Sequence, residues 1–247
     1  SSMDDYIDSK GKLFRQCNHG VLNIDDDHFY DMIQRGDSSI NTYGYNEKAD
    51  LRAVKLDLVR DGHFVGIKLE TAGVINDTFM ISSPGEFSSY NAMAAILTCH
   101  MLGIDTDCIK EALSNFSVKG RVEPVWVSDD FTLLIDYAHN GVSTKSILST
   151  IRKYDPGRIV TIFGCGGNRS KDRRYEMGEI ASKYSDFCII TEDNNRYEEF
   201  DDIAKDIMKN FDKKCDHVII PDRKEAIKYA IENGKKGDII MLIGKGH

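Results

Sequence analysis

The stretch IVTIFGCGGNR, residues 159–169, decides the fold: a β-branched apolar run ends in a glycine-rich turn. Short apolar runs of this kind are typical of buried parallel strands. Glycines directly after such a strand let backbone amides approach a ligand closely. Arg169 stands where an α/β fold places its ligands, just outside the carboxyl end of a strand. The alternative is a plain loop that leads into a helix whose basic residues, Lys171, Arg173 and Arg174, face solvent.

Around this stretch, the second half of the chain alternates between strand and helix patterns. The expected strands are 122–127, 132–135, 158–163, 187–191, 217–220 and 238–243. The expected helices are 142–153, 174–183, 200–209 and 223–233. This order predicts a mainly parallel, three-layer, Rossmann-like α/β domain.

Polar clusters recur where four of these strands end. They are DYAH (136–139), GCGGNR (164–169), EDNNR (192–196) and GKGH (244–247). Because the carboxyl ends of parallel strands meet at one edge of a sheet, we expect a single polar site there. Arginine binds carboxylates bidentately, and Asp or Asn binds an ammonium group, so the mixture suits a zwitterionic or carboxylate-bearing small molecule.

The first half of the chain has a different pattern. Residues 40–81 alternate apolar and polar side chains around the hairpin dipeptide Asp61-Gly62, which predicts an antiparallel sheet with one solvated face. Helices are expected before it, at 3–17, and after it, at 90–102 and 106–116. The segment 118–121 is the expected boundary between two domains, 1–118 and 119–247.

Composition narrows the class of protein. The net charge of -8 over 247 residues gives no general support for nucleic-acid binding. The sequence has no signal peptide or transmembrane run, and its six cysteines form no CxxC pair, which favours reduced thiols in a cytoplasmic protein. We expect a monomer without nucleic-acid or membrane partners. The chain lacks an initiator Met and stops after GKGH, so we interpret it as a fragment.

Two other kinds of site are disfavoured. His139 and Cys165 could form a Cys/His nucleophile pair, but nothing near Cys165 in the sequence indicates a depressed thiol pKa. A zinc site is disfavoured because no paired ligand spacing occurs.

Five motifs together resemble the Mur ligase family of peptidoglycan synthesis, and most closely its MurE type, which adds the third peptide residue. They are GRVE (120–123), DYAH (136–139), FGCGGNR (163–169), DNNR (193–196) and GKGH (244–247). The order and spacing of all five are highly specific, and the similarity covers essentially the whole chain.

The resemblance implies a domain organisation. Residues 1–118 would be the later part of the family's central ATPase domain, with an antiparallel subsheet. Residues 119–247 would be most of its Rossmann-like C-terminal domain. The family's UDP-sugar domain and its phosphate-binding GKT loop are absent, since no G-x-x-x-x-G-K-[ST] occurs in the sequence. The fragment is therefore expected to be inactive alone.

The resemblance also implies a reaction. Family members use ATP to convert the carboxylate of UDP-N-acetylmuramoyl-L-alanyl-D-glutamate to an acyl phosphate, which the amine of a diamino acid then attacks. Mg²⁺ is a cofactor, and a carbamylated lysine helps to bind it. The matching lysine is Lys10, with Lys12 as the competing assignment by spacing.

Matches to the family also imply binding residues. Asn91 matches an asparagine that contacts adenine, and Ser88 stands where the family often has another Asn. Arg121 matches an arginine near the ATP phosphates, Asp136 matches the acid at the ribose, and His139 lies near the same junction.

A second set of matches implies the pocket for the added amino acid: Arg169, Asp193, Asn194, Arg196 and Gly244. Diaminopimelate-adding members usually read Asp-Asn-Pro-Arg, and this chain has Asn195 in place of the proline. Arg196 matches the arginine of this motif, which would bind the distal carboxylate of diaminopimelate. Lysine-adding members usually lack that arginine, so meso-diaminopimelate is favoured over L-lysine.

Two alternatives stay open. One is another ligase of the superfamily, similar to cyanophycin synthetase or folylpolyglutamate synthetase, against which the DNNR motif argues. The other is a non-catalytic binding protein that keeps the fold, which the missing phosphate-binding loop would suit.

Overall fold

The computed structural model describes residues 2–62 and 64–245 of the chain. They form two compact units, one of Ser1–Val59 with Gly66–Phe116 and one of Arg60–Val65 with Ser117–His247. We refer to them as the N-terminal and the C-terminal unit and describe each by itself. Among the described residues, none of the helices combines the length and the apolar character that crossing a membrane requires.

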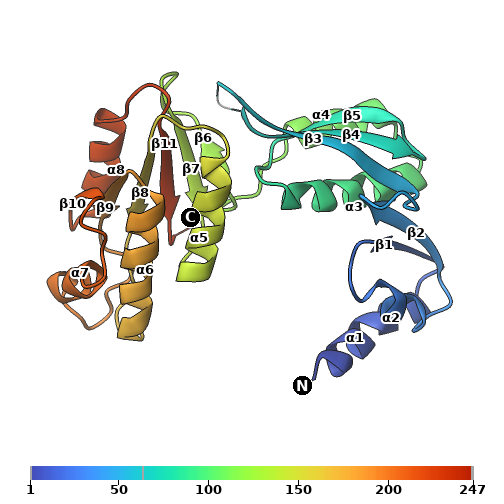
Figure 1. The fold of residues 1–247 in the computed structure, drawn as a ribbon, viewed down its shortest axis with the longest axis horizontal. Helices are drawn as coiled ribbons and strands as arrows, with labels where there is room; N and C mark the ends of the chain where they lie inside the picture. Colours follow the sequence, from blue (N-terminus) through green and yellow to red (C-terminus); the bar gives the residue numbers. More distant parts are fainter. Residues whose placement is uncertain (1, 63, 246–247) are drawn as a thin grey trace. The chain divides into compact units, whose positions relative to one another are not determined.

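The N-terminal unit is built on a mixed sheet in the order β1-β2-β3-β4-β5 (Figure 1). Its strands are β1 (His19–Asn23), β2 (Ser39–Gly44), β3 (Leu51–Asp61), β4 (Phe64–Gly73) and β5 (Asp77–Ile81). Its helices are α1 (Met3–Gly11), the 3-10 turn η1 (Lys12–Arg15), α2 (Phe29–Ile33), α3 (Phe87–Met101) and α4 (Thr106–Ser114).

The sequence-based prediction for this sheet is right only in part. Strand β4 pairs antiparallel with β5, as expected. However, β2 pairs parallel with both β1 and β3, so the prediction of an antiparallel sheet from residue 40 onward is wrong. An alternating apolar pattern reports which face of a strand is buried, and it does not report the direction of the neighbouring strand.

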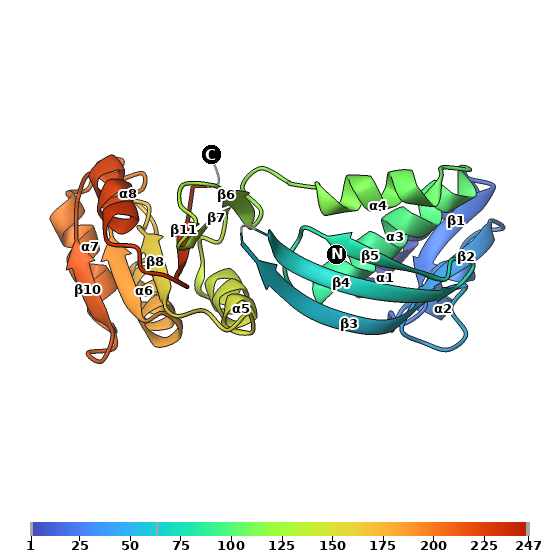
Figure 2. The same ribbon diagram turned by 90° about the horizontal axis from the view of Figure 1, so that it is seen from above.

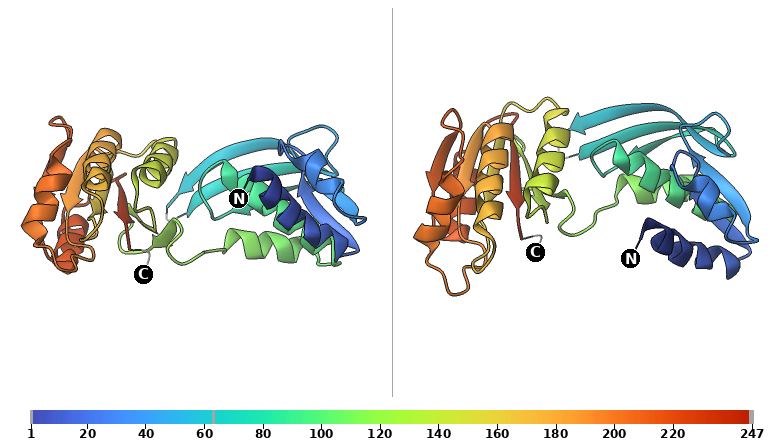
Figure 3. Two further views of the ribbon diagram at one scale, coloured as in Figure 1. Left: turned by 90° about the horizontal axis from the view of Figure 1, so that it is seen from below. Right: turned by 60° about the horizontal axis from the view of Figure 1, so that its bottom comes forward.

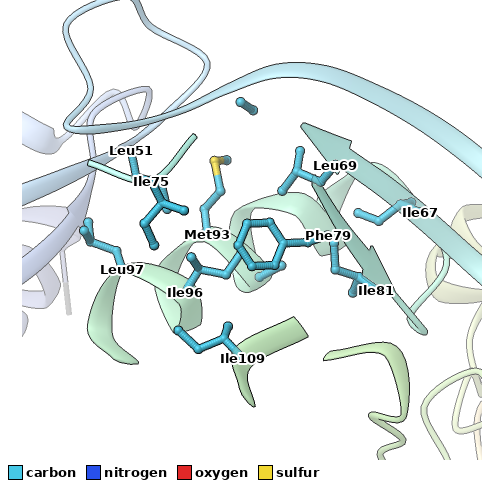
Figure 4. Close-up of a cluster of buried hydrophobic side chains, with 12 residues drawn as sticks. Leu51, Ile67, Leu69, Ile75, Phe79, Ile81, Met93, Ile96, Leu97 and Ile109 are labelled. Carbon is cyan, nitrogen blue, oxygen red and sulfur yellow. The ribbon is translucent and has the colours of Figure 1, made fainter. Parts of the chain in front are cut away.

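The core of the N-terminal unit lies between this sheet and the helices α3 and α4 (Figure 3). Leu69, Phe79 and Ile81 of the sheet pack against Met93 and Ile96 of α3 (Figure 4). All five side chains are almost completely buried. The alternating strand residues and the i, i+3 spacing on α3 thus meet as one apolar layer.

The C-terminal unit contains a six-stranded sheet in the order β10-β9-β8-β11-β7-β6. The strands are β6 (Glu123–Val125), β7 (Thr132–Asp136), β8 (Ile159–Phe163), β9 (Phe187–Ile190), β10 (Asp216–Ile219) and β11 (Ile239–Ile243). All neighbouring pairs are parallel except β6 with β7. The expected mainly parallel sheet is therefore confirmed.

Helices cover both faces of that sheet, which gives the three expected layers (Figure 2). On one face lies α8 (Arg223–Glu232), whose Ala226 and Ala230 pack against Val160 and Ile240. On the other lie α5 (Gly141–Arg152) and α6 (Lys171–Tyr184), with α7 (Phe200–Met208) beside α6 (Figure 1). Because both faces are covered, the central strands are mostly apolar.

Candidate functional site

Four parallel strands of the C-terminal unit, β7, β8, β9 and β11, end at the same edge of the sheet. A cavity of about 690 Å³ opens there. Its lining combines residues that follow all four strands: His139 after β7, Arg169 after β8, Asp193, Asn194 and Arg196 after β9, and Gly244 after β11. Six of the ten residues singled out from the sequence are thus brought together in one cavity.

Two loops form most of the cavity wall, and they pack backbone against backbone. We call residues 164–170 the glycine loop and residues 191–199 the arginine loop. A Cβ atom at Gly164 would lie 2.2 Å from the Thr191 carbonyl oxygen, and one at Gly167 would lie 1.8 Å from that of Asn195. The Gly167 amide donates to the Asn194 carbonyl at 2.8 Å. The glycines are required because any side chain would separate the loops.

Arg196 lies on the arginine loop and reaches across to the glycine loop. Its guanidinium donates to the carbonyl oxygen of Gly167, and its side chain remains exposed to the cavity. Its backbone is left-handed, with φ of +52°, a conformation that is uncommon for residues other than glycine. Asn195 restrains the same loop through its amide, which donates to Glu192 Oε2 at 3.4 Å.

Charges of both signs line the cavity. Arg169, Arg173, Arg196 and Lys245 contribute positive charge, and Asp193 with Glu192 contributes negative charge. Lys245 Nζ lies 3.9 Å from Asp193 Oδ1. Gly244 allows this approach because its φ of +102° is open to glycine alone among common residues. A cavity of this kind suits a ligand that carries carboxylates and an ammonium group.

Arg174 is a residue of this site that the sequence analysis misread, because its side chain is buried and does not face solvent. Its guanidinium pairs with both carboxylate oxygens of Glu198, each at 2.7 Å, and with Asp206 at 2.9 Å. Hydrogen bonding to Arg174 is the main reason why the pKa of Glu198 falls to about 2. The signal was available, because Arg174, Met177 and Ala181 follow one helical face.

Two further residues matched to ATP binding, Asp136 and Arg121, belong to this unit. Asp136 is buried, and its carboxylate accepts backbone amides from Val122 at 3.0 Å and Ala138 at 2.8 Å. The structure therefore gives it a role in holding the chain after β7. The guanidinium of Arg121 is exposed and lies 5.7 Å from the centre of the Tyr137 ring.

The remaining two candidates belong to the N-terminal unit. Lys10 is exposed on α1, with Nζ 5.5 Å from the centre of the Tyr6 ring, beside a cavity of about 300 Å³. Asn91 is exposed on α3, whereas Ser88 is buried and donates to the Pro84 carbonyl at 2.9 Å. Among the described residues, no group of three or more His, Cys, Asp or Glu side chains could hold a metal ion.

Cys165 lies in the glycine loop, and burial raises the pKa of its thiol to about 12. At neutral pH the thiol is therefore protonated, which agrees with the sequence-based interpretation that it is not a nucleophile.

We expect Cys165 to react far more slowly with iodoacetamide than the exposed Cys108, because only the thiolate attacks the reagent. Mass spectrometry of peptides after timed labelling measures both rates in one sample. Labelling of Cys165 at the rate of Cys108 would contradict a raised pKa of the Cys165 thiol.

Comparison with known proteins identifies the family. The model of the Mur ligase, glutamate ligase domain matches residues 120–246, and that of the Mur ligase middle domain matches residues 1–99. A 2,6-diaminopimelate ligase of UDP-N-acetylmuramoyl-L-alanyl-D-glutamate from Caldanaerobacter subterraneus subsp. tengcongensis is 40% identical over 100% of this chain and 51% of its own length. Its counterpart from Aquifex aeolicus is 38% identical over 100% of this chain and 50% of its own length.

Solved structures give the same result for the fold. A structure of a UDP-N-acetylmuramoyl-L-alanyl-D-glutamate–2,6-diaminopimelate ligase superposes with a TM-score of 0.78 at 26% identity, covering 100% of this chain and 52% of that one. Folylpolyglutamate synthase from Thermotoga maritima, at 16% identity and 99% and 55% coverage, shares the fold with a TM-score of 0.74. The chain spans about half the length of the curated relatives that it matches. With its whole second half matched by one Mur ligase domain and residues 1–99 by another, this chain belongs to the Mur ligase family.

Proposed function

We propose that the natural polypeptide is an ATP-dependent ligase of peptidoglycan synthesis. It joins the D-glutamyl carboxylate of UDP-N-acetylmuramoyl-L-alanyl-D-glutamate to an amine of meso-diaminopimelate through an amide bond. Relatives at 34–40% identity that carry the name of this ligase support the proposal. In this view residues 1–118 belong to the ATP-binding central domain and residues 119–247 to the domain that receives the amino acid.

The observation that carries the choice of amino acid is the pair of arginines on adjoining loops. Arg169 and Arg196 both line the cavity of about 690 Å³, and Asp193 lines the same cavity. Diaminopimelate has a carboxylate at each end, and each guanidinium can bind one bidentately. Lysine has no distal carboxylate and would leave one of the two guanidinium groups without an anionic partner.

In the proposed reaction the terminal phosphoryl group of ATP passes to the D-glutamyl carboxylate and forms an acyl phosphate. The free amine of diaminopimelate then attacks the acyl carbon, so that a C–N bond forms and the C–O bond to phosphate breaks. The amine loses its proton, and phosphate leaves with the electron pair. The cavity residues contribute by positioning: two arginines fix the carboxylates, and Asp193 orients an ammonium group.

In this proposal Asn91 of the N-terminal unit contacts ATP, and so do Arg121, Asp136 and His139 of the C-terminal unit. Mg²⁺ neutralises the ATP phosphates when it is bound. The protein ligand that we propose for Mg²⁺ is a carbamate on Lys10.

We expect carbamylation at Lys10 and not at Lys12. The natural polypeptide, incubated with ¹³C-bicarbonate, should show a carbamate carbon signal that Lys10→Arg removes and Lys12→Arg leaves in place, because Arg cannot form the carbamate. A signal that persists in Lys10→Arg and disappears in Lys12→Arg would reverse the assignment.

The proposed reaction also indicates the compartment and the substrates of the protein. We propose a cytoplasmic monomer whose partners are the UDP-sugar dipeptide and the diamino acid, acting in cell wall biogenesis and so in cell shape and division. All six cysteines are free of disulfides, as a reducing compartment favours.

The test is ADP release by the natural polypeptide in the presence of ATP, Mg²⁺ and the UDP-sugar dipeptide. We expect release that depends on meso-diaminopimelate and exceeds that with L-lysine by about 100-fold or more in kcat/KM, the value of two lost charge-assisted hydrogen bonds. Equal use of lysine would refute the choice of amino acid, and release that needs glutamate or a folate would favour the other superfamily ligases. Absence of turnover together with tight nucleotide or peptide binding would favour a binding protein.

A further inference from the structure

Arg174 is a buried charged group of the C-terminal unit that the proposed reaction leaves without a task. Its side chain is 1% exposed, yet it lies on α6 directly behind the cavity. A buried guanidinium must be paired to be tolerated, and Arg174 is paired three times, with Glu198, Asp206 and the Gly166 carbonyl. Its Nε atom has no hydrogen-bond acceptor among the described residues.

These partners come from three separate segments. Gly166 belongs to the glycine loop, Glu198 to the arginine loop, and Asp206 to α7. Arg174 therefore connects the two loops that carry Arg169 and Arg196. Both guanidinium–carboxylate contacts to Glu198 are 2.7 Å long, and such a bidentate pair fixes distance and orientation together.

Glu198 extends the connection back to the glycine loop. Its Oε1 accepts the backbone amide of Asn168, and the Asn168 side chain in turn accepts the amide of Tyr197 at 3.3 Å. Asn168 has a left-handed backbone with φ of +52°, like Arg196. Asn tolerates this conformation by itself, whereas it is uncommon for Arg, so the surrounding contacts help to hold the arginine loop at Arg196.

Stability alone is a poor reason for this arrangement. Arg174 is buried and Glu198 is half-buried. Such a pair gives little net stability compared with apolar side chains of similar volume, because the guanidinium loses its hydration. What the pair does provide is a defined geometry. The geometry matters here because neither loop is part of a helix or a strand, so no regular hydrogen-bond ladder holds the loops in register.

We propose that Arg174 and Glu198 form a positioning pair that holds the glycine loop and the arginine loop at one spacing, and that this spacing selects an amino acid with a carboxylate at each end. The inference rests on the proposed function. Arg174 acts through Arg169 and Arg196, whose separation must match the distance between the two carboxylates. Loops that move independently still bind one carboxylate, and they no longer distinguish diaminopimelate from lysine.

The test uses two variants with matched controls in the natural polypeptide. Arg174→Lys keeps the positive charge but cannot form the two parallel hydrogen bonds to Glu198. Glu198→Gln keeps the shape of the side chain and removes its negative charge. The controls are Arg152→Lys, whose ion pair with Asp186 joins α5 to the start of β9, and Glu199→Gln, an exposed neighbour of Glu198.

Steady-state kinetics give the first readout. We expect each variant to raise KM for diaminopimelate about tenfold or more, while kcat and KM for the UDP-sugar dipeptide stay within about twofold. The preference for diaminopimelate over lysine should fall by a similar factor. An unchanged KM for diaminopimelate would overturn the positioning role. So would a general effect, in which kcat falls, KM rises for both substrates and Tm is lower.

Hydrogen exchange gives a second readout that does not depend on turnover. The amides of Gly167 and Asn168 should exchange faster in Arg174→Lys and Glu198→Gln than in the wild type, and at the wild-type rate in Glu199→Gln. Unchanged exchange at both amides would overturn the coupling. If the wild-type enzyme prefers lysine, the proposed function and the selectivity both fail, and faster exchange in the two variants would still support the coupling of the loops.

Discussion

Arg196→Ala is expected to raise KM for diaminopimelate by about 100-fold or more, because it removes charge-assisted hydrogen bonds to one carboxylate that are together worth about 3 kcal/mol. The use of lysine should change much less, since lysine has no carboxylate for Arg196 to bind. Steady-state kinetics of ADP release with each amino acid measure both effects.

Tyr197→Ala is the matched control for this variant. Tyr197 is the next residue of the arginine loop, and its side chain is 96% exposed. The contact from Arg196 to the Gly167 carbonyl will also be lost in Arg196→Ala, so hydrogen exchange of the glycine loop should be followed in parallel. If Arg196→Ala lowers kcat/KM equally for lysine and for diaminopimelate, then Arg196 supports the loops and does not bind the distal carboxylate.

The second large effect is expected for Gly167→Ala. The new Cβ would lie 1.8 Å from the Asn195 carbonyl oxygen, and this partner is backbone that cannot rotate away. The loops must separate, which should lower the stability of the protein by about 2 kcal/mol or more. A displacement of about 1 Å at the binding groups typically lowers kcat/KM about 100-fold, so diaminopimelate use should be largely lost.

Gly166→Ala shows whether the effect comes from the close approach or from losing any glycine in this loop. A Cβ at Gly166 would meet nothing closer than 3.5 Å, which is an ordinary contact. The free energy of unfolding of the Gly166→Ala variant, measured with urea, should stay within about 0.5 kcal/mol of the wild-type value. Equal destabilisation by Gly166→Ala and Gly167→Ala would contradict the backbone packing described here.

Much of the site could be predicted because parallel strands have a simple geometry. Once residues 132–135, 158–163, 187–191 and 238–243 are identified as buried parallel strands, the polar residues after them must meet at one edge. The cavity at that edge, lined by His139, Arg169, Asp193, Arg196 and Gly244, agrees with this prediction.

The contacts across the loops could not be predicted in the same way. A solvated helix face for Arg174 was one of two interpretations of the sequence, and its partners Glu198 and Asp206 are 24 and 32 residues away. Arginine is rarely buried, so the local pattern gives no reason to expect such partners. Asp136 illustrates the same limit, because a local pattern does not reveal that its carboxylate accepts two backbone amides. Pairing directions are also long-range properties, and the parallel placement of β2 was missed for that reason.

The most direct test of the central claim is calorimetric titration of the chain itself with meso-diaminopimelate and, separately, with L-lysine. We predict that diaminopimelate binds in a one-to-one ratio and that lysine binds about 100-fold more weakly, as expected for the two lost charge-assisted hydrogen bonds to one carboxylate. Binding of diaminopimelate should disappear in Arg196→Ala and persist in Tyr197→Ala. Lysine binding as tight as that of diaminopimelate, and unaffected by Arg196→Ala, would contradict the assignment of this cavity to an amino acid with two carboxylates.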